Sequence, residues 1–558
     1  MSFSLSLNEI EQNILKLKKI MNAQNLDAFY VSSYDEFLNE YVPREECYRY
    51  YFTGFTGSVA EILVPKSGRV LLFVDGRYHE QADLEIDDKL VEVVKCNHSI
   101  LPFEDLLSKI QMLGYKKIGA FGNRSLKTDI DSINKFSVIE FIDSSSIDID
   151  FSSYNSKSKI RNVEGCTKEI KEFNDKAFFT SKLDSIAWAT GLRGFQLPFQ
   201  ATFKAKMLYQ NGKAILLVPN LELVEQNVLN RTDLEFIESE ATDSKLLVSK
   251  LISDELYINE DEVSALDYSN FSNEKKVIHH DGLTNFQANK NQQEIECIER
   301  AFFKSDKIIF NSLCEVLEKD ENFTEKDFFN LVNKNYEKAG ALSLSFNTIS
   351  SIGSNSSIIH FSSPSEEVKL KDSELILLDS GALYETGFAT DTTRVVIKGQ
   401  AKDWQKEIYT LTLKSLISAF INDFPKGISG KEIDEIIRRP IKAKGYDYAH
   451  GTGHGVGINV HEGGYSITPR STIILQKNRI GSIEPGIYLP GKGGVRLENI
   501  VKVEEVNEKL RLIPIVYIGF FPELIKVEDL TSEEKSYLKD YETICQSRGT
   551  GFGLLNYL

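Results

Sequence analysis

Acidic side chains that could act together occur first in the segment 374–399, which reads ELILLDSGALYETGFATDTTRVVIKG. An apolar run ends in Asp379, and a second run begins just after Asp391. Aspartate is a poor strand residue, so a strand that ends in Asp379 needs a reason. We predict two strands joined by a turn, with the two carboxylates at their facing ends. The ordinary alternative for Asp379 is a strand-end cap or an Asx-turn.

Histidines are concentrated in the segment 447–464, which reads DYAHGTGHGVGINVHEGG. It contains three of the eight histidines of the chain, His450, His454 and His461. Glycine at every second position from 451 to 457 disfavours a helix and lets the backbone approach a ligand closely. Imidazoles in such a loop can bind metal, carry protons or donate hydrogen bonds. The alternative, a polar turn with incidental histidines, fits a histidine-poor chain less well.

Two glutamates occupy the segment 481–503, GSIEPGIYLPGKGGVRLENIVKV. Glu484 precedes a Pro-Gly turn, and Glu498 lies within a strand-like pattern between apolar residues. A glutamate buried among apolar residues needs a cation or a metal as its partner. The alternative is an alternating strand that exposes Glu498 to water.

Together the three segments contribute four carboxylates and one imidazole that suit a metal site. Such an oxygen-dominated set suits Mn²⁺ or Mg²⁺ better than copper, and some sets of this kind suit Zn²⁺ or Co²⁺. Four negative charges balance two divalent cations, and two metals about 3.5–4 Å apart can ionise a water and polarise a carbonyl. Amide hydrolysis is the natural chemistry of that arrangement. The residues are Asp379, Asp391, His454, Glu484 and Glu498.

The segments before this region read as α/β domains. The chain has 558 residues, which predicts roughly three or four domains. Apolar residues at helical spacing predict a helix over 8–22, and apolar runs predict strands over 26–33 and 70–78. The polar run over 143–161 predicts the first linker, and we place the end of the first domain within it, so that this domain covers 1–155.

A second domain is predicted over 156–285. The segment 166–194 is interpreted as a helix that feeds a strand and a glycine turn, and 214–220 as a later strand. LDAFYVSS followed by TGFTGS in the first domain is echoed by LDSIAWATGLRG in the second. The echo indicates a duplicated domain, or two α/β units that share common ingredients.

A third domain, predicted over 286–558, contains all five candidate metal ligands and must position them. It begins with a helix-rich region, 286–340, followed by short β segments and glycine-rich loops up to about 525. The segment 534–546 predicts a terminal helix.

Composition excludes several classes of function. Lysine and arginine number 65 against 82 aspartates and glutamates, a net charge of −17. This balance argues against a nucleic-acid binder and against a polybasic membrane anchor. No apolar run approaches membrane-spanning length, and the first residues lack the pattern of a signal peptide. The six cysteines never form a CxxC motif, so we expect reduced thiols, no zinc finger and a cytoplasmic protein.

The motifs DSGALYETGFATDTTR, SIIHFSSP, HGTGHGVG, INVHEGG, EPGIY and VRLENIV resemble those of metallopeptidases with the pita-bread fold. Within that group they most resemble the aminopeptidase P (Xaa-Pro aminopeptidase) family, in its three-domain cytoplasmic type. YFTGFTGS, VDGRYHEQA and LDSIAWATGLRG extend the resemblance to the N-terminal regions. It implies an α/β and α+β architecture, with two creatinase-like N-terminal α/β domains and a C-terminal pita-bread catalytic domain.

The resemblance also implies a site that holds two divalent metal ions, Mn²⁺ by family and ligand type, with Co²⁺ or Zn²⁺ as alternatives. Asp391 and Glu498 would bridge the ions, Asp379 would hold one ion, and His454 with Glu484 would hold the other. Glu484 would in addition act as general base and accept the proton of the water that bridges the metals.

Further roles follow from the same resemblance. His360 and His461 match histidines that contact the substrate and steady the tetrahedral intermediate. His450 matches a histidine of the proline pocket, or is structural. Arg496 matches an arginine that orients a carboxylate such as Glu498, or forms a plain cross-strand salt bridge.

Two loops depart from the family pattern. The interval from Asp379 to Asp391 is one residue longer than usual, and the loop between His454 and His461 is about two residues shorter than in the long enzymes.

The implied activity is hydrolysis of the N-terminal Xaa-Pro bond of peptides by a homodimer, with no nucleic-acid or membrane partner. Proline lacks an N–H and has a fixed φ, so apolar side chains and histidines can recognise its ring. The free amino terminus would meet Asp379. Prolidase, an Xaa-Pro dipeptidase, is the first alternative, and the doubled N-terminal region argues against it. A non-catalytic pita-bread binding protein is the second alternative, and the full ligand set argues against that.

Overall fold

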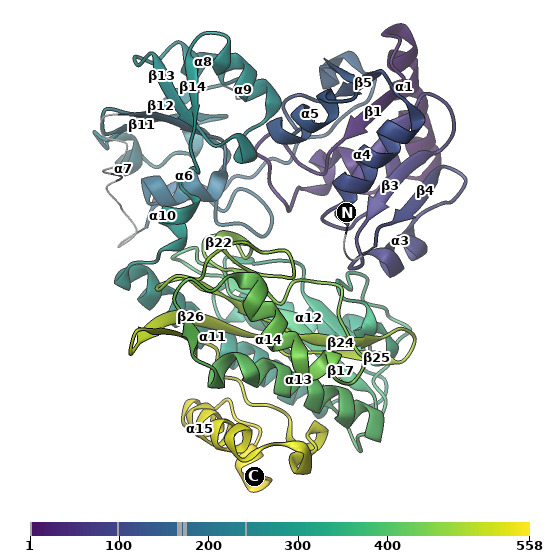
Figure 1. Cartoon of the computed structure of the whole chain (residues 1–558), viewed down its shortest axis with the longest axis vertical. Helices are drawn as coiled ribbons and strands as arrows, with labels where there is room; N and C mark the ends of the chain where they lie inside the picture. Colours follow the sequence, from purple (N-terminus) through teal and green to yellow (C-terminus); the bar gives the residue numbers. More distant parts are fainter. Residues whose placement is uncertain (1–2, 98–99, 164–169, 171–175, 240–242) are drawn as a thin grey trace. The chain divides into compact units, whose positions relative to one another are not determined.

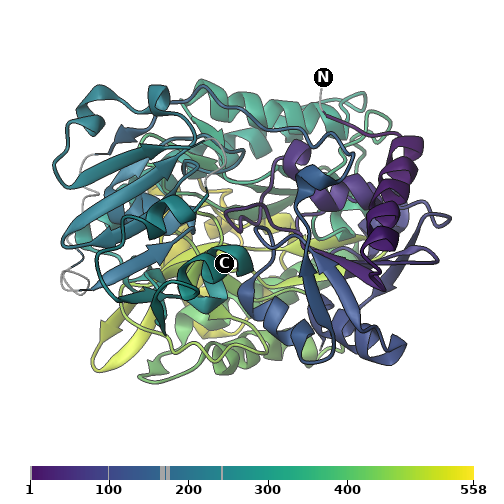
Figure 2. The ribbon, with the colours of Figure 1, turned by 90° about the horizontal axis from the view of Figure 1, so that it is seen from above.

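The computed structural model describes most of the chain (Figure 1; seen from above in Figure 2). The described residues are 3–97, 100–163, 170, 176–239 and 243–558. The chain divides into two compact units, which are Met1–Pro198 with Thr202–Leu283, and Phe199–Ala201 with Thr284–Leu558. Throughout the described ranges, every helix is too short or too polar to cross a membrane.

The first unit begins with a six-stranded sheet in the order β4-β3-β2-β1-β5-β6. Pairing is antiparallel from β1 to β2 and from β2 to β3, and parallel elsewhere. Its strands are β1 (Ala28–Val31), β2 (Glu61–Pro65), β3 (Val70–Val74), β4 (Val91–Lys95), β5 (Lys117–Ala120) and β6 (Val138–Phe141). Its helices are α1 (Leu7–Ala23), α2 (Tyr48–Thr53), α3 (His79–Glu85), α4 (Pro102–Leu113) and α5 (Lys127–Asn134).

Both faces of this sheet are covered, because alternate residues of each strand point to opposite sides. Phe29 and Val31 of β1 belong to one core with α1, whereas Ala28 and Tyr30 belong to another with α4 and α5. The predicted helix over 8–22 is confirmed as α1, and the strands over 26–33 and 70–78 as β1 and β3.

A second six-stranded sheet follows, in the order β12-β11-β10-β8-β13-β14. Its strands are β8 (Ala177–Thr180), β10 (Lys206–Gln210), β11 (Lys213–Val218), β12 (Leu234–Glu238), β13 (Glu255–Ile258) and β14 (Lys276–His279). The remaining elements are α6 (Leu183–Thr190), α7 (Gln226–Leu229), α8 (Lys245–Val248), α9 (Ala265–Ser272) and the pair β7 (Arg161–Asn162) and β9 (Leu192–Arg193). Order and strand directions repeat those of the first sheet, so the duplicated-domain prediction is confirmed.

The match between the two copies differs from the one that the sequence suggested. LDAFYV forms strand β1, whereas LDSIAWAT forms helix α6, so these two segments are not equivalent. The equivalent helices are α2 and α6, which end at left-handed Gly54 and Gly191. In the described part of the predicted segment 166–194, helix α6 does lead into the short strand β9, but strand β8, which was not predicted, precedes the helix. Residues 166–169 and 171–175 of that segment lie outside the described residues.

The second unit contains the predicted catalytic region. Its helices are α10 (Thr284–Ala288), α11 (Gln292–Leu317), α12 (Glu325–Lys338), α13 (Asp403–Ile421), α14 (Gly430–Lys442) and α15 (Ser532–Arg548). A three-stranded antiparallel sheet consists of β16 (Ile349–Ile352), β17 (Leu375–Ser380) and β19 (Thr392–Ile397). Two short pairs are β15 (Ser343–Leu344) with β18 (Ala382–Leu383), and β24 (Gly486–Leu489) with β25 (Gly493–Arg496). The helical predictions for 286–340 and 534–546 are confirmed.

A second, six-stranded sheet of this unit runs β20-β27-β26-β23-β21-β22. Its strands are β20 (Phe424–Pro425), β21 (Gly453–Gly455), β22 (Glu462–Ile467), β23 (Ile480–Ile483), β26 (Asn499–Val506) and β27 (Lys509–Pro514). Helices α13 and α14 pack together over strands of both sheets (Figure 1). One core thus joins Leu413 of α13, Ile437 of α14, Leu377 of β17 and Val501 of β26.

A buried acid pair lies in the first domain. Glu61 on β2 and Asp129 on α5 both face the hydroxyl of Tyr30, whose oxygen lies 2.9 Å from Glu61 Oε2 and 3.2 Å from Asp129 Oδ2. A hydroxyl has one hydrogen to donate, so the second carboxyl bonds to it only by carrying a proton of its own. Burial, and then repulsion by Asp129, raise the pKa of Glu61 to about 8, while burial raises the pKa of Asp129 to about 6.

We expect this pair to make the stability of the first unit depend on pH. An unfolded glutamate has a pKa of about 4.3, so the native Glu61 keeps a proton that the unfolded chain has already lost. The stabilisation is complete below that value and is lost as the pH rises through about 8. Calorimetry should show the melting temperature of the first unit falling across this range, and Glu61→Gln should flatten the fall. Exposed Glu11→Gln is the control, and a Glu61→Gln profile as steep as that of the unaltered protein would contradict the interpretation.

Candidate metal centre

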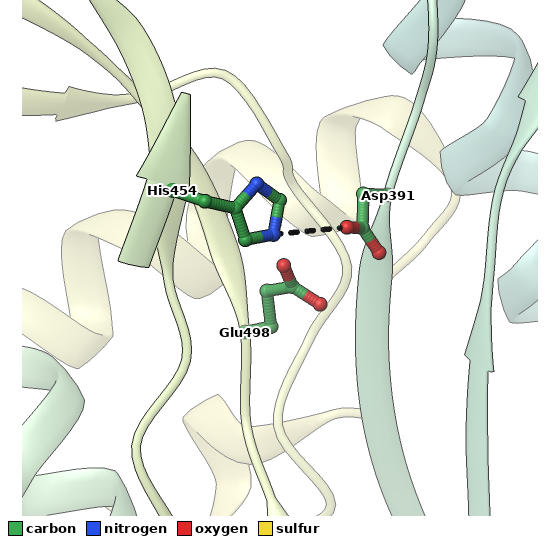
Figure 3. A group of neighbouring side chains, drawn as sticks. All are labelled: Asp391, His454 and Glu498. Atoms are coloured by element: carbon green, nitrogen blue, oxygen red, sulfur yellow. Dashed lines mark ion pairs between the residues drawn. The ribbon is translucent and has the colours of Figure 1, made fainter. Parts of the chain in front are cut away.

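Three of the predicted ligands lie together where strands of the second unit begin or end. Asp391 immediately precedes β19, His454 is in β21, and Glu498 lies between β25 and β26. One ligand atom from each of the three lies within 4.8 Å of those of the other two. His454 Nε2 is 3.5 Å from Asp391 Oδ2, and the three side chains point toward one another (Figure 3).

The antiparallel pairing of β17 and β19 places the two aspartates. Asp379 is opposite Thr393, so Asp391 follows the connecting turn on the neighbouring strand, near the same end of the sheet. The turn requires glycine at 381, because a Cβ there would lie 1.7 Å from the carbonyl oxygen of Thr390. Both aspartates are buried. The predicted pair of strands with carboxylates at facing ends is therefore confirmed, and the Asx-turn alternative is not needed.

Glu484 follows strand β23 and lies between two histidines. Its Oε1 is 3.4 Å from His454 Nε2, and its Oε2 is 3.8 Å from His450 Nδ1. Buried Ser482 fixes this arrangement, since its hydroxyl accepts from the His454 amide at 3.0 Å and donates to Glu484 Oε1 at 3.2 Å. The Glu484 side chain is 17% exposed and that of Asp391 7%, so Glu484 is the more accessible acid.

Arg496 connects two of the buried carboxylates. Its guanidinium donates to Asp379 Oδ2 at 2.6 Å, to the Tyr488 hydroxyl at 2.9 Å and to Thr393 Oγ1 at 3.1 Å. Thr393 in turn donates to Glu498 Oε2 at 2.9 Å. Arg496 thus holds Asp379 directly and Glu498 through one hydroxyl. A plain cross-strand salt bridge describes only part of this network.

The electrostatics of the cluster favour bound cations. Burial, followed by repulsion from Asp379 and Glu484, raises the pKa of Asp391 well above its usual range. Burial, and then repulsion from Asp391, do the same to the pKa of Glu498. Asp379 Oδ1 and Glu498 Oε1 are buried and have no hydrogen-bond donor among the described residues. Buried carboxylate oxygens without donors, in a cluster that also contains the His454 imidazole, are a donor set for divalent cations, so the residues present fit such ions.

The other predicted histidines differ in how closely they approach this group. The ring of His461 packs edge-on against that of His454, with centroids 4.4 Å apart. His450 is buried, and its Nε2 lies 2.8 Å from the Tyr488 hydroxyl. His360 is half-buried in a turn, and the carbonyl of its neighbour Ile359 accepts from Arg496 at 3.3 Å.

Arg394 connects the backbone of the site to the C-terminal helix α15. It is buried in β19, bonds the backbone carbonyl of Glu498, and donates to Asn499 Oδ1 at 2.7 Å. It also donates to the Tyr541 hydroxyl on α15 at 3.1 Å and to the Ile518 carbonyl at 2.9 Å. The C-terminal helix is thereby connected to the backbone that carries Glu498.

Sequence reasoning missed Tyr488, Thr393 and Ser482. Tyr488 lies on β24, two residues after Gly486, and Gly486 pairs with Arg496 on β25. A hairpin predicted over this segment would therefore have placed Tyr488 near Arg496. The hydroxyls of Thr393 and Ser482 have no distinguishing sequence signal. The solvent-exposed alternative for Glu498 is wrong, since the residue is 1% exposed and the strand pattern is interrupted beside it.

Comparison with protein families defines the class. Residues 297–505 match metallopeptidase family M24, and residues 13–147 and 144–294 each match the creatinase/prolidase N-terminal domain. The region 297–505 is therefore similar to metallopeptidase family M24, and two regions similar to the creatinase/prolidase N-terminal domain precede it. The predicted fold class is confirmed, whereas the domain boundaries near 155 and 285 and the roles of the site residues stay predictions.

Among its curated relatives are proteins named probable Xaa-Pro aminopeptidase P. That of Pyricularia oryzae is 28% identical across 97% of this chain and 96% of its own length. That of Coccidioides posadasii is 29% identical across 98% of this chain and 97% of its own.

Solved structures show the same architecture. The X-prolyl aminopeptidase of Caenorhabditis elegans, described as a cytosolic enzyme with a di-nuclear active site, superimposes with a TM-score of 0.87 at 21% identity, over 97% of each chain. Prolidase from Pyrococcus furiosus, 26% identical, has a TM-score of 0.51 and covers 97% of its own chain but only 62% of this one.

Proposed function

We propose that the protein is a metal-dependent aminopeptidase that hydrolyses the N-terminal Xaa-Pro bond of peptides. The convergence of Asp391, His454 and Glu498, with ligand atoms within 4.8 Å, is the observation that carries the proposal. Their place in an M24 domain behind two creatinase/prolidase N-terminal domains supports it, as do the full-length relatives named Xaa-Pro aminopeptidase P.

In this proposal five residues hold two divalent cations, with Mn²⁺ favoured by the oxygen-rich donor set and Co²⁺ or Zn²⁺ as alternatives. Asp391 and Glu498 would be shared by the two ions, Asp379 would hold one of them, and His454 with Glu484 would hold the other. The short distance between Glu484 and His454 and the unpaired oxygens of Asp379 and Glu498 support this assignment. When bound, the ions lower the pKa of a water and polarise the scissile carbonyl.

The remaining steps belong to side chains of this chain. Glu484 accepts the proton of the attacking water and passes it to the leaving proline nitrogen, which has no hydrogen of its own. His461 and His360 stabilise the negative oxygen of the tetrahedral intermediate. His450, held by the Tyr488 hydroxyl, lines the pocket of the proline ring.

The amino terminus of the substrate meets Asp379. Arg496 holds Asp379 Oδ2 at 2.6 Å, which leaves Oδ1 for the ammonium group and its neighbouring cation. A free amino terminus is therefore required of the substrate.

Comparison of three peptides tests the activity. With Mn²⁺ present, we expect cleavage of Xaa-Pro-Yaa and no cleavage of the dipeptide Xaa-Pro or of Xaa-Ala-Yaa, which lacks the proline ring. Cleavage of the dipeptide alone would assign the protein as a prolidase. Absence of turnover on all three would favour a non-catalytic binding protein.

We further propose a cytoplasmic homodimer that binds neither nucleic acid nor membranes. The net charge of −17 and the free thiols of Cys47, Cys96, Cys297, Cys314 and Cys545 support this setting; Cys166 lies outside the described residues. The domain boundaries near 155 and 285 remain part of this proposal; the two creatinase/prolidase matches overlap at 144–147, and the second one ends at 294. Light scattering measures the mass of the assembly.

A further inference from the structure

A buried ion pair lies beside the predicted substrate histidine His461. Lys290, between α10 and α11, pairs with Glu462, the first residue of β22, and the two side chains are 1% and 2% exposed. The ammonium also donates to the Gln287 carbonyl at 2.8 Å. A buried pair of this kind needs further hydrogen bonds to compensate for the loss of hydration.

The Glu462 carboxylate accepts those hydrogen bonds from a side chain near Lys290 and from the backbone of the loop that connects His454 to His461. Its Oε2 accepts from the Gln287 side chain at 2.8 Å and from the Ile458 backbone amide at 3.2 Å. Gly457 leaves the necessary space, since a Cβ there would lie 1.9 Å from Oε2. The carboxylate therefore fills the interior of the short loop that connects His454 to His461.

That loop determines how the two histidines face each other. Gly455 of β21 pairs with Glu462 of β22, and the register of the two strands shifts between His454 and Gly455. His454 therefore directly precedes one member of this pair, and His461 directly precedes the other. The Gly457 carbonyl also accepts the Ala389 amide at 2.7 Å, in the turn that leads to Asp391. A displacement of Glu462 would thus move His461 relative to the metal ligands.

We propose that Lys290 is a positioning residue for this reaction: by pairing with Glu462 it fixes the 456–461 loop, and so the His461 ring against His454. The role of His461 in the reaction rests on the proposed function, whereas the effect on the loop does not. Buried Arg479 is a second cation near Glu462. It interacts with the Glu462 carboxylate through charge attraction and not through a hydrogen bond.

Lys290→Met tests the proposal, with Lys206→Met as the matched control. Lys206 forms another buried pair, at 2.9 Å from Asp267, in the second sheet and outside the predicted catalytic unit. We expect Lys290→Met to lower kcat on Xaa-Pro-Yaa by about 10- to 100-fold, the scale on which small misplacements act. KM and the bound Mn²⁺ per chain should change by less than about twofold, and Lys290→Arg should recover most of kcat.

Hydrogen exchange of the metal-free protein gives a readout that is independent of turnover. The Ile458 amide should exchange faster in Lys290→Met than in the unaltered protein or in Lys206→Met. Gln287→Leu, which removes one bond to Glu462, should produce a smaller change in the same direction, and it decides the question if Lys290→Met does not fold.

The outcomes separate the two proposals. Unchanged kcat and unchanged Ile458 exchange, with a lowered melting temperature like that of Lys206→Met, would overturn the positioning role. Without turnover by the unaltered protein the proposed function fails, and Ile458 exchange alone then supports or overturns the role of Lys290 in the loop.

Discussion

Replacing Glu484 by glutamine is expected to lower kcat on an Xaa-Pro-Yaa peptide by about 10²- to 10⁴-fold, the usual contribution of a general base. The amide keeps the size of the side chain and can still accept the Ser482 hydrogen bond, but it cannot take a proton from water. The loss should therefore fall on kcat more than on KM. Steady-state kinetics at saturating Mn²⁺ measures it.

Glu484 is also a predicted ligand, so bound metal must be counted in the same samples. Exposed Glu407→Gln on α13 is the control for the charge change, and its turnover should equal that of the unaltered protein. Turnover by Glu484→Gln within twofold of normal would remove Glu484 from the mechanism. A loss of metal in proportion to the loss of activity would leave it a ligand and not a base.

Asp391→Asn is expected to have opposite effects with and without metal. With Mn²⁺, the variant should bind fewer ions per chain and lose more than about 100-fold in kcat, because even outer-shell partners of a metal contribute 10- to 100-fold. Without metal, the same change removes one of several buried carboxylates that repel one another, and the melting temperature should rise. Metal analysis and calorimetry on chelated and reloaded protein measure both effects.

Asp540→Asn, on the exposed side of α15, is the control for loss of a carboxylate and should show neither effect. A metal-free melting temperature that falls in Asp391→Asn would mean that Asp391 stabilises the fold by itself. The picture of a repulsive cluster held together by cations would then be wrong.

The convergence of Asp391, His454 and Glu498 was predictable because the predicted ligands lie at or beside strand ends with unusual local chemistry. Asp379 interrupts a run of buried aliphatic residues, and glycines around His454 exclude a helix, so both positions stand out without knowledge of the fold. The antiparallel pairing of β17 and β19 follows from the turn between two apolar runs. Local pattern was sufficient here.

The supporting residues could not be found in this way, because their partners are distant in sequence. Thr393 and Arg496 are 103 residues apart, and Lys290 and Glu462 are 172 apart. Neither a threonine in a strand nor a lysine before a helix is unusual, so only the folded chain reveals these contacts.

Helix α6 was not located within the predicted segment 166–194 for another reason. Nearly all of its residues are buried, so LDSIAWAT lacks the apolar and polar faces that identify a surface helix. A short apolar run of this kind cannot be distinguished from a buried strand by periodicity alone.

The contacts of Arg394 have a consequence for the order of events during synthesis. This arginine connects the backbone of Glu498 to Tyr541, near the end of the chain, while the N-terminal sheets contain their own hydrogen-bonding partners and cores. Domains generally fold from the N-terminus as they leave the ribosome. The N-terminal sheets can therefore form before α15 is synthesised, whereas the backbone at Glu498 gains its connection to Tyr541 only when α15 has emerged.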